Sequence, residues 1–93
     1  MSAFILILTW HCDPGHEWLE VPAPLVDRLQ ILNDISEYSY YSHDKGQYFL
    51  EGDCDAAVLI DALRLNGIEF VTRFKSYNRD ASIRRMARVG SAE

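Results

Sequence analysis

Residues 52–76 read GDCDAAVLIDALRLNGIEFVTRFKS, and this stretch decides the fold class. The run over 56–66 is apolar around most of a helix, and the two aspartates ahead of it can accept hydrogen bonds from the first-turn amides. Gly67 supplies the left-handed conformation that ends many helices. From 68 to 76 apolar and charged side chains alternate, which predicts a strand with one charged face. A helix followed at once by a strand indicates a domain of mixed type.

Two hairpins and a second helix are predicted upstream. An apolar run begins the chain and suits a central strand covered on both faces, and a DPG turn at 13–15 returns it as a second strand. Pro24 is well placed as the first residue of a short amphipathic helix. The predicted strands are 3–10, 16–21, 36–42 and 47–51, and the predicted helix between the hairpins is 24–33.

The predicted order is therefore ββαββαβ. It implies a two-layer α+β domain over 1–77, with a mainly antiparallel five-stranded sheet and both helices on one face. Residues 78–93 form an arginine-rich C-terminal arm with a short helix over 82–89. We expect this arm to pack on the domain.

Length and charge limit the class of protein. Ninety-three residues with a net charge of −5 describe one soluble domain, which excludes a repeat or multidomain protein. Residues 1–71 hold twelve acidic and three basic side chains, whereas 72–93 hold six basic and two acidic ones. The apolar start lacks a basic flank and is too short for a membrane span, so we expect a cytoplasmic protein with no membrane partner, no cofactor and two reduced cysteines.

Four potential metal ligands surround the first turn, namely His11, Cys12, Asp13 and His16. Imidazole, thiolate and carboxylate are all ligands for zinc, but the spacing is not that of paired structural ligands. We favour a structural role in which Asp13 accepts hydrogen bonds from the turn amides and His16 closes the end of the sheet. The alternative is a small metal-dependent or histidine-based enzyme centred on His11, Asp13 and His16.

Cys54 is a second candidate for catalysis. It lies near the start of the main helix, where the helix dipole lowers a thiol pKa, but the flanking aspartates disfavour a thiolate. We therefore expect a buried cysteine that fills space.

Aromatic and basic side chains form two candidate binding clusters. Tyrosines on the second hairpin can form an interface patch or a homodimer contact, and nucleobase stacking is disfavoured by the acidic neighbours. The basic cluster can grip phosphates or a partner, or fold back on the acidic body, which we favour. The tyrosines are Tyr38, Tyr40, Tyr41 and Tyr48, and the arginines are Arg79, Arg84, Arg85 and Arg88.

A longer pattern, DPGH-x-WL-x-VP at 13–22, IS-x-YSY at 35–40 and LE-x-DCDA at 50–56, resembles a group of small bacteriophage, plasmid and bacterial proteins of unknown activity. Two positions depart from that pattern: Glu17 stands where we expect glycine, and Gly52 where we expect glutamate. The resemblance implies a mobile-element setting and no catalytic residues.

The leading hypothesis is a small non-enzymatic interaction protein of this type, an inhibitor of a host nucleic-acid-handling defence complex. Its acidic surface would face a basic groove of the host protein. A nucleic-acid binder acting through the arginine arm is the remaining alternative. The acidic residues expected at the surface are Glu17, Glu20, Asp44, Glu51, Asp53 and Asp55.

Overall fold

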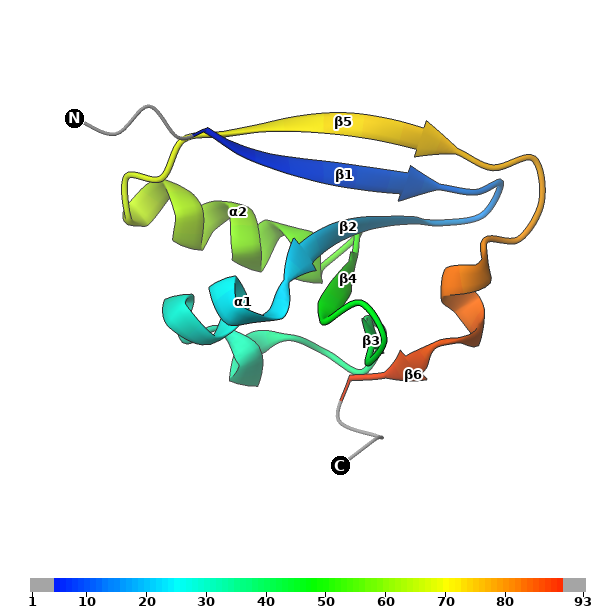
Figure 1. Cartoon of the computed structure of the whole chain (residues 1–93), viewed down its shortest axis with the longest axis horizontal. Coiled ribbons are helices and arrows are strands. Elements are labelled where there is room, and N and C mark those ends of the chain that lie inside the picture. The colour runs from blue at the N-terminus through cyan, green and yellow to red at the C-terminus, as the bar shows by residue number, and fades with distance from the viewer. Residues whose placement is uncertain (1–4, 90–93) are drawn as a thin grey trace.

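A computed structural model of the chain describes residues 5–89 (Figure 1). The predicted strand start at 3–4 and the end of the predicted arm at 90–93 lie outside the described residues. The predicted α+β class is confirmed, and the described part of the chain holds six strands instead of five. The strands are β1 (Leu6–Cys12), β2 (Glu17–Pro22), β3 (Tyr40–Ser42), β4 (Gln47–Glu51), β5 (Phe70–Ser76) and β6 (Ala87–Arg88), and the helices are α1 (Ala23–Leu29), η1 (Leu32–Asp34), α2 (Asp55–Leu65) and η2 (Ser82–Arg85).

The strands form one mostly antiparallel sheet in the order β5-β1-β2-β4-β3-β6. Among residues 5–89, only the β1–β5 pair is parallel. Both predicted hairpins are present, and Gly46 takes a positive φ in the second turn, where an L residue would be strained. No helix within residues 5–89 is long and apolar enough to cross a membrane.

Both α-helices cover one face of the sheet and bury the main core. Strand side chains that point to this face, such as Leu19, Val21 and Leu50, pack against Val26 of α1 and Leu59 of α2. The alternation predicted for the second strand is confirmed, because Trp18 points to the opposite face.

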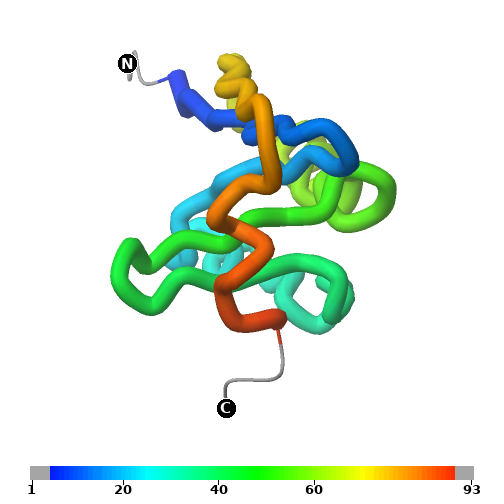
Figure 2. Tube along the Cα trace, turned by 90° about the vertical axis from the view of Figure 1, so that its right-hand side faces the viewer, coloured from blue at the N-terminus to red at the C-terminus, as the bar shows by residue number. Residues whose placement is uncertain are grey.

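The opposite face is covered by the C-terminal segment. Figure 2 shows this segment crossing the sheet from β5 at one edge to β6 at the other. Ala81 and Ile83 are buried against Trp18, Tyr40 and Phe49 in a second apolar cluster. This half of the sheet thus has three layers.

Four local predictions are wrong. The first strand is central but covered on both faces only in part, since Ile7 is 52% exposed. The first helix ends at Leu29 because Gln30 adopts the left-handed conformation, with φ 58°. The third strand starts at Tyr40, and residues 82–89 form a 3-10 turn and a short strand instead of a helix.

The cap of the main helix also differs from the prediction. Cys54 holds the cap position of α2, and no side chain bonds to the first-turn amides. Asp55 is instead buried and accepts hydrogen bonds from the Ser36 amide and from the hydroxyls of Ser36 and Ser39. These bonds turn residues 36–39 out of the strand that their β propensity predicted.

Candidate functional site

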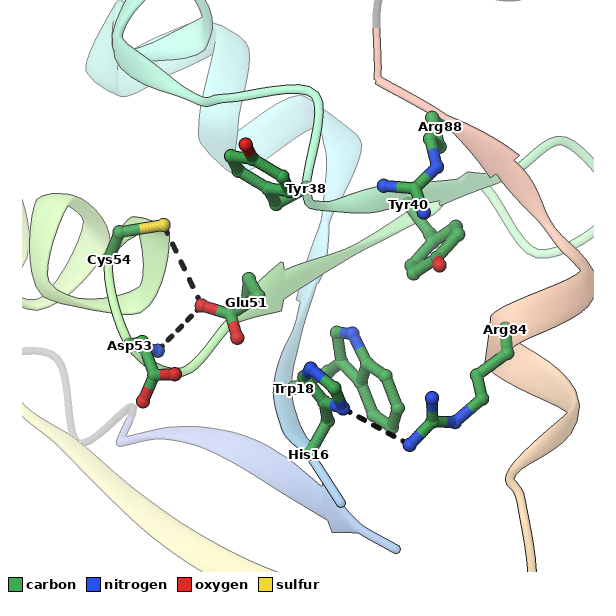
Figure 3. Close-up of a pocket in the computed structure, with 9 residues that line it drawn as sticks. All are labelled: His16, Trp18, Tyr38, Tyr40, Glu51, Asp53, Cys54, Arg84 and Arg88. Carbon is green, nitrogen blue, oxygen red and sulfur yellow. Dashed lines mark hydrogen bonds between the residues drawn. The ribbon is translucent and has the colours of Figure 1, made fainter.

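A pocket of about 380 Å³ opens where the C-terminal segment meets the sheet (Figure 3). One wall comes from η2 and β6, the floor from β2 and β3, and the other wall from the β4–α2 turn. The lining residues are His16, Trp18, Tyr38, Tyr40, Glu51, Asp53, Cys54, Arg84 and Arg88.

Arg84 is held in place by the first turn. Its Nε and Nη2 donate to the two carboxylate oxygens of Asp13 at 2.7 and 2.9 Å. The same guanidinium lies 5.5 Å from the Trp18 ring centroid, and its Nη2 is 3.1 Å from Nδ1 of His16. A bidentate ion pair and a stacked ring together fix the arginine before any ligand arrives.

Asp13 is the anchor of this arrangement. Its side chain is fully buried and also accepts hydrogen bonds from the amides of Gly15, His16 and Ala81. The hydrogen bonds from Arg84, helped by those amides, hold the pKa of the Asp13 carboxyl well below its usual range, although burial opposes them. The role predicted for Asp13 as an acceptor of turn amides is confirmed.

Arg88 and the tyrosines form the upper part of the pocket. The Arg88 guanidinium lies 5.2 Å from the Tyr40 ring centroid, and its Nη1 donates to the carbonyl of Glu37 at 3.2 Å. Tyr40 is buried and packs edge-on against Trp18. Tyr38 stands on the rim and is 61% exposed. The pocket therefore presents flat rings and guanidinium edges.

The facing wall is acidic. Glu51 Oε1 accepts hydrogen bonds from the Asp53 amide at 2.7 Å and from the Cys54 thiol at 3.6 Å. Partial burial of the thiol raises the pKa of Cys54. A hydrogen bond with Ser36 lowers this pKa, but the carboxylates of Asp55 and Glu51 raise it, and the net effect is an increase. The acidic neighbours therefore disfavour a thiolate, as predicted from the flanking aspartates, but the residue as a whole is exposed and not buried as expected.

Of the four residues proposed as metal ligands, Cys12, Asp13 and His16 line one hollow of about 290 Å³, and His11 lies apart from them. His11 is buried on the sheet, where Nε2 lies 2.7 Å from Glu20 and Nδ1 lies 2.9 Å from the Tyr77 hydroxyl. Asp13 binds Arg84, and the Cys12 thiol faces Glu17 at 3.8 Å. No group of three metal-ligating side chains occurs among residues 5–89.

The six acidic residues expected at the surface divide into two sets. Asp55 and Glu51 are buried, and Glu20 binds His11 and Gln47. Burial on its own would raise the pKa of Glu20, but the hydrogen bonds from His11 and Gln47 lower it more. The exposed members are Glu17, Asp44 and Asp53.

The tyrosines and arginines are also divided. Tyr41 and Tyr48 lie on the helix side of the sheet, with ring centroids 4.7 Å apart, and do not join Tyr38 and Tyr40 at the pocket. Arg84 and Arg88 line the pocket, whereas Arg79 and Arg85 are exposed outside it. The predicted hairpin patch is thus two separate surfaces.

Sequence reasoning missed the pairing of Asp13 with Arg84 and of His11 with Tyr77. Each pair joins residues more than 60 positions apart, and no local spacing predicts such contacts. The signal in the sequence is the charge difference between the acidic body and the arginine-rich segment. It indicates that the two meet, but not through which residues.

The two departures from the phage and plasmid pattern lie opposite each other. The Gly52 amide donates to the Glu17 carbonyl at 2.9 Å, and a Cβ added at Gly52 would lie 2.5 Å from Cγ of Glu17. An exchange of glycine and glutamate between these two positions therefore keeps one carboxylate at the same place on the surface.

Comparison of the chain with known protein families, with curated protein sequences and with solved structures finds no match. Its function must therefore be inferred from its own residues.

Proposed function

We propose that this chain is a non-enzymatic binding protein that docks on a partner protein through the pocket between β2, β3 and η2. The observation that carries the proposal is the convergence of Tyr38, Tyr40 and Trp18 with Arg84 and Arg88. Tyr, Trp and Arg dominate the binding energy of protein interfaces. Because Arg84 and Tyr40 are already fixed by internal contacts, little side-chain entropy is lost when a partner binds there.

The charged side chains around the pocket indicate which side chains a partner would present to it. Asp53 is exposed on the wall opposite the arginines, and Glu17 is exposed in a neighbouring hollow that Asp53 also lines. A matching surface presents basic side chains to this wall and an aromatic or acidic group to Arg88. Proteins that handle nucleic acid carry such basic surfaces. Together with the resemblance to phage and plasmid proteins, this favours a host defence complex in the cytoplasm as the partner.

The two alternatives have weaker support. An enzyme centred on His11, Asp13 and His16 needs these side chains to converge. His11 instead lies on the sheet against Glu20 and Tyr77, apart from Asp13 and His16, which both contact Arg84. Nucleic-acid binding by the arm has less support because Glu51 and Asp53 line the same pocket as Arg84 and Arg88, and these carboxylates would repel phosphate groups.

Affinity capture from a natural host lysate tests the proposal. The tagged chain should retain one partner protein, and Tyr38→Ala should lower the captured amount at least tenfold, which corresponds to about 1.4 kcal/mol. Leu65→Ala is the matched control, because Leu65 is 87% exposed on α2, outside the pocket. Equal capture by Tyr38→Ala and the unchanged chain would refute the pocket as the binding site, and release by nuclease would favour the arginine arm.

A further inference from the structure

β5 is an open edge of the sheet. Within residues 5–89, β1 is its only strand partner (Figure 1). The strand runs in unbroken register with β1 from Phe70 opposite Leu6 to Ser76 opposite Cys12. Edge strands are commonly protected by proline, bulges, short length or charged side chains, and β5 has none of the first three. It does carry two charges, Arg73 and Lys75.

The backbone hydrogen bonds at the two ends of β5 show which of its residues direct their N–H and C=O groups toward β1. The Leu6 amide donates to the Glu69 carbonyl at 3.2 Å, and the Tyr77 amide donates to the Cys12 carbonyl at 2.8 Å. In a parallel pair, alternate residues direct both backbone groups to the same neighbour. The odd-numbered residues therefore face β1, and Phe70, Thr72 and Phe74 direct their N–H and C=O groups to the open edge.

The side chains of this strand are unusually apolar for an exposed edge. Phe74 is 69% exposed and Val71 is 49% exposed. Phe70, at the start of the strand, lines a hollow of about 610 Å³ together with Arg64 and Ile68. The edge thus offers both unpaired backbone groups and apolar surface.

We propose that β5 pairs with β5 of a second copy of this chain, antiparallel and centred on Thr72. This register places Phe70 opposite Phe74 of the second copy and Thr72 opposite its own equivalent. Phe70, Thr72 and Phe74 then exchange backbone hydrogen bonds with the second copy, as a two-fold axis requires. The exposed Phe74 ring would then contact Phe70 of the second copy, beside the hollow that Phe70 lines.

Charge and the length of the strand together select this register. Centred on Thr72, the pairing sets Glu69 opposite Lys75, twice by symmetry, and opposite charges across strands stabilise the pair. A register centred on Arg73 would set two arginines opposite each other, which is destabilising. A register centred on Val71 would also set opposite charges against each other, Glu69 and Arg73. It would, however, leave Phe74 and Lys75 opposite residues 68 and 67, which precede the strand, and Gly67 has a positive φ.

Sedimentation of the full chain over a concentration series, with charge-reversal variants, tests the proposal. The unchanged chain should form a dimer of twice the mass of one chain. Glu69→Lys alone sets lysine opposite Lys75, and Lys75→Glu alone sets glutamate opposite Glu69, so each should raise the dimer dissociation constant at least tenfold. The double variant restores the opposite charges and should restore the dimer.

Both positions are exposed, so circular dichroism should confirm an unchanged fold in every variant. A chain that is monomeric at all concentrations would overturn the proposal, as would a double variant that fails to recover the dimer. A dimer that survives both single reversals but dissociates in Tyr41→Ala would assign the interface to the β3–β4 hairpin instead.

Discussion

Asp13 shows how one side chain joins the two ends of the chain. Its carboxylate closes the β1–β2 turn through the amides of Gly15 and His16 and binds the C-terminal segment through Ala81 and Arg84. The acidic part of the sequence and its basic end are therefore linked at one buried group. The position of Arg84 in the pocket depends on this link.

Asp13→Asn should destabilise the protein in a pH-dependent way. Losing the charge weakens the hydrogen bonds from Arg84 and the amides, which we expect to lower the free energy of unfolding at pH 7 by about 2 kcal/mol. The folded pKa of Asp13 lies below its value in the unfolded chain. The stabilisation is thus complete above the unfolded pKa of about 4 and is lost as pH falls below it.

Urea unfolding at a series of pH values measures this difference. The gap between the two proteins should be constant from neutral pH to about pH 5 and should narrow below about pH 4. Asp44→Asn on the exposed β3–β4 turn is the control and should change the free energy of unfolding by less than about 0.5 kcal/mol. A gap that persists unchanged at pH 2 would contradict the role of the Asp13 charge.

At the scale of elements, the sequence predicted those helices, strands and turns that depend on the local pattern of side chains. The helix over 56–66, its end at Gly67, both hairpins and the two faces of β2 all follow from side-chain period and turn chemistry. The segment 36–39 was mistaken for strand because Asp55, 16 positions beyond Ser39, draws its serines inward. Residues 82–89 were mistaken for helix because Ile83 packs on Trp18 across the sheet.

The candidate site was predicted only in part, for the same reason. The sequence identified Tyr38, Tyr40, Arg84 and Arg88 as candidate binding residues, and these four line one pocket. It did not predict that they meet, because they come from two segments joined by tertiary contacts alone. Trp18 was missed as a site residue because a tryptophan within a strand is expected in the core.

The junction between β2 and the β4–α2 turn carries a testable coupling. Gly52→Glu alone should lower the free energy of unfolding by about 1 kcal/mol, because its Cβ would meet Glu17 and two carboxylates would face each other. Gly52 is not in the left-handed region, so the backbone itself accepts glutamate. Adding Glu17→Gly should remove most of this loss.

Thermal unfolding of the two single variants and the double variant gives the coupling free energy directly. We expect the double variant to be more stable than the sum of the single effects by about 1 kcal/mol. Purely additive effects would show that the two positions are not in contact.

At the scale of the whole molecule, the C-terminal segment belongs to the core. The helices cover one face of the sheet, and residues 81–86 cover part of the other, where Trp18, Tyr40 and Phe49 would otherwise meet water. The face remains open near β5, where Ile7 and Val71 are exposed. The covered half carries the pocket, and the open half carries the edge to which we assign the second copy.

Ile83→Ala measures how far the fold depends on this cover. Ile83 is 2% exposed, so its truncation leaves a cavity against Trp18 and should lower the free energy of unfolding by about 3 kcal/mol. Ile7→Ala removes the same atoms from a half-exposed site on the same face and should cost less than about 1 kcal/mol. Urea unfolding, followed by tryptophan fluorescence, compares the two. The η2 turn that Ile83 anchors also carries Arg84, so the Ile83 variant should bind the captured partner more weakly at temperatures where it is still folded. Equal losses of stability in the two variants would show that the segment lies on the sheet without stabilising it.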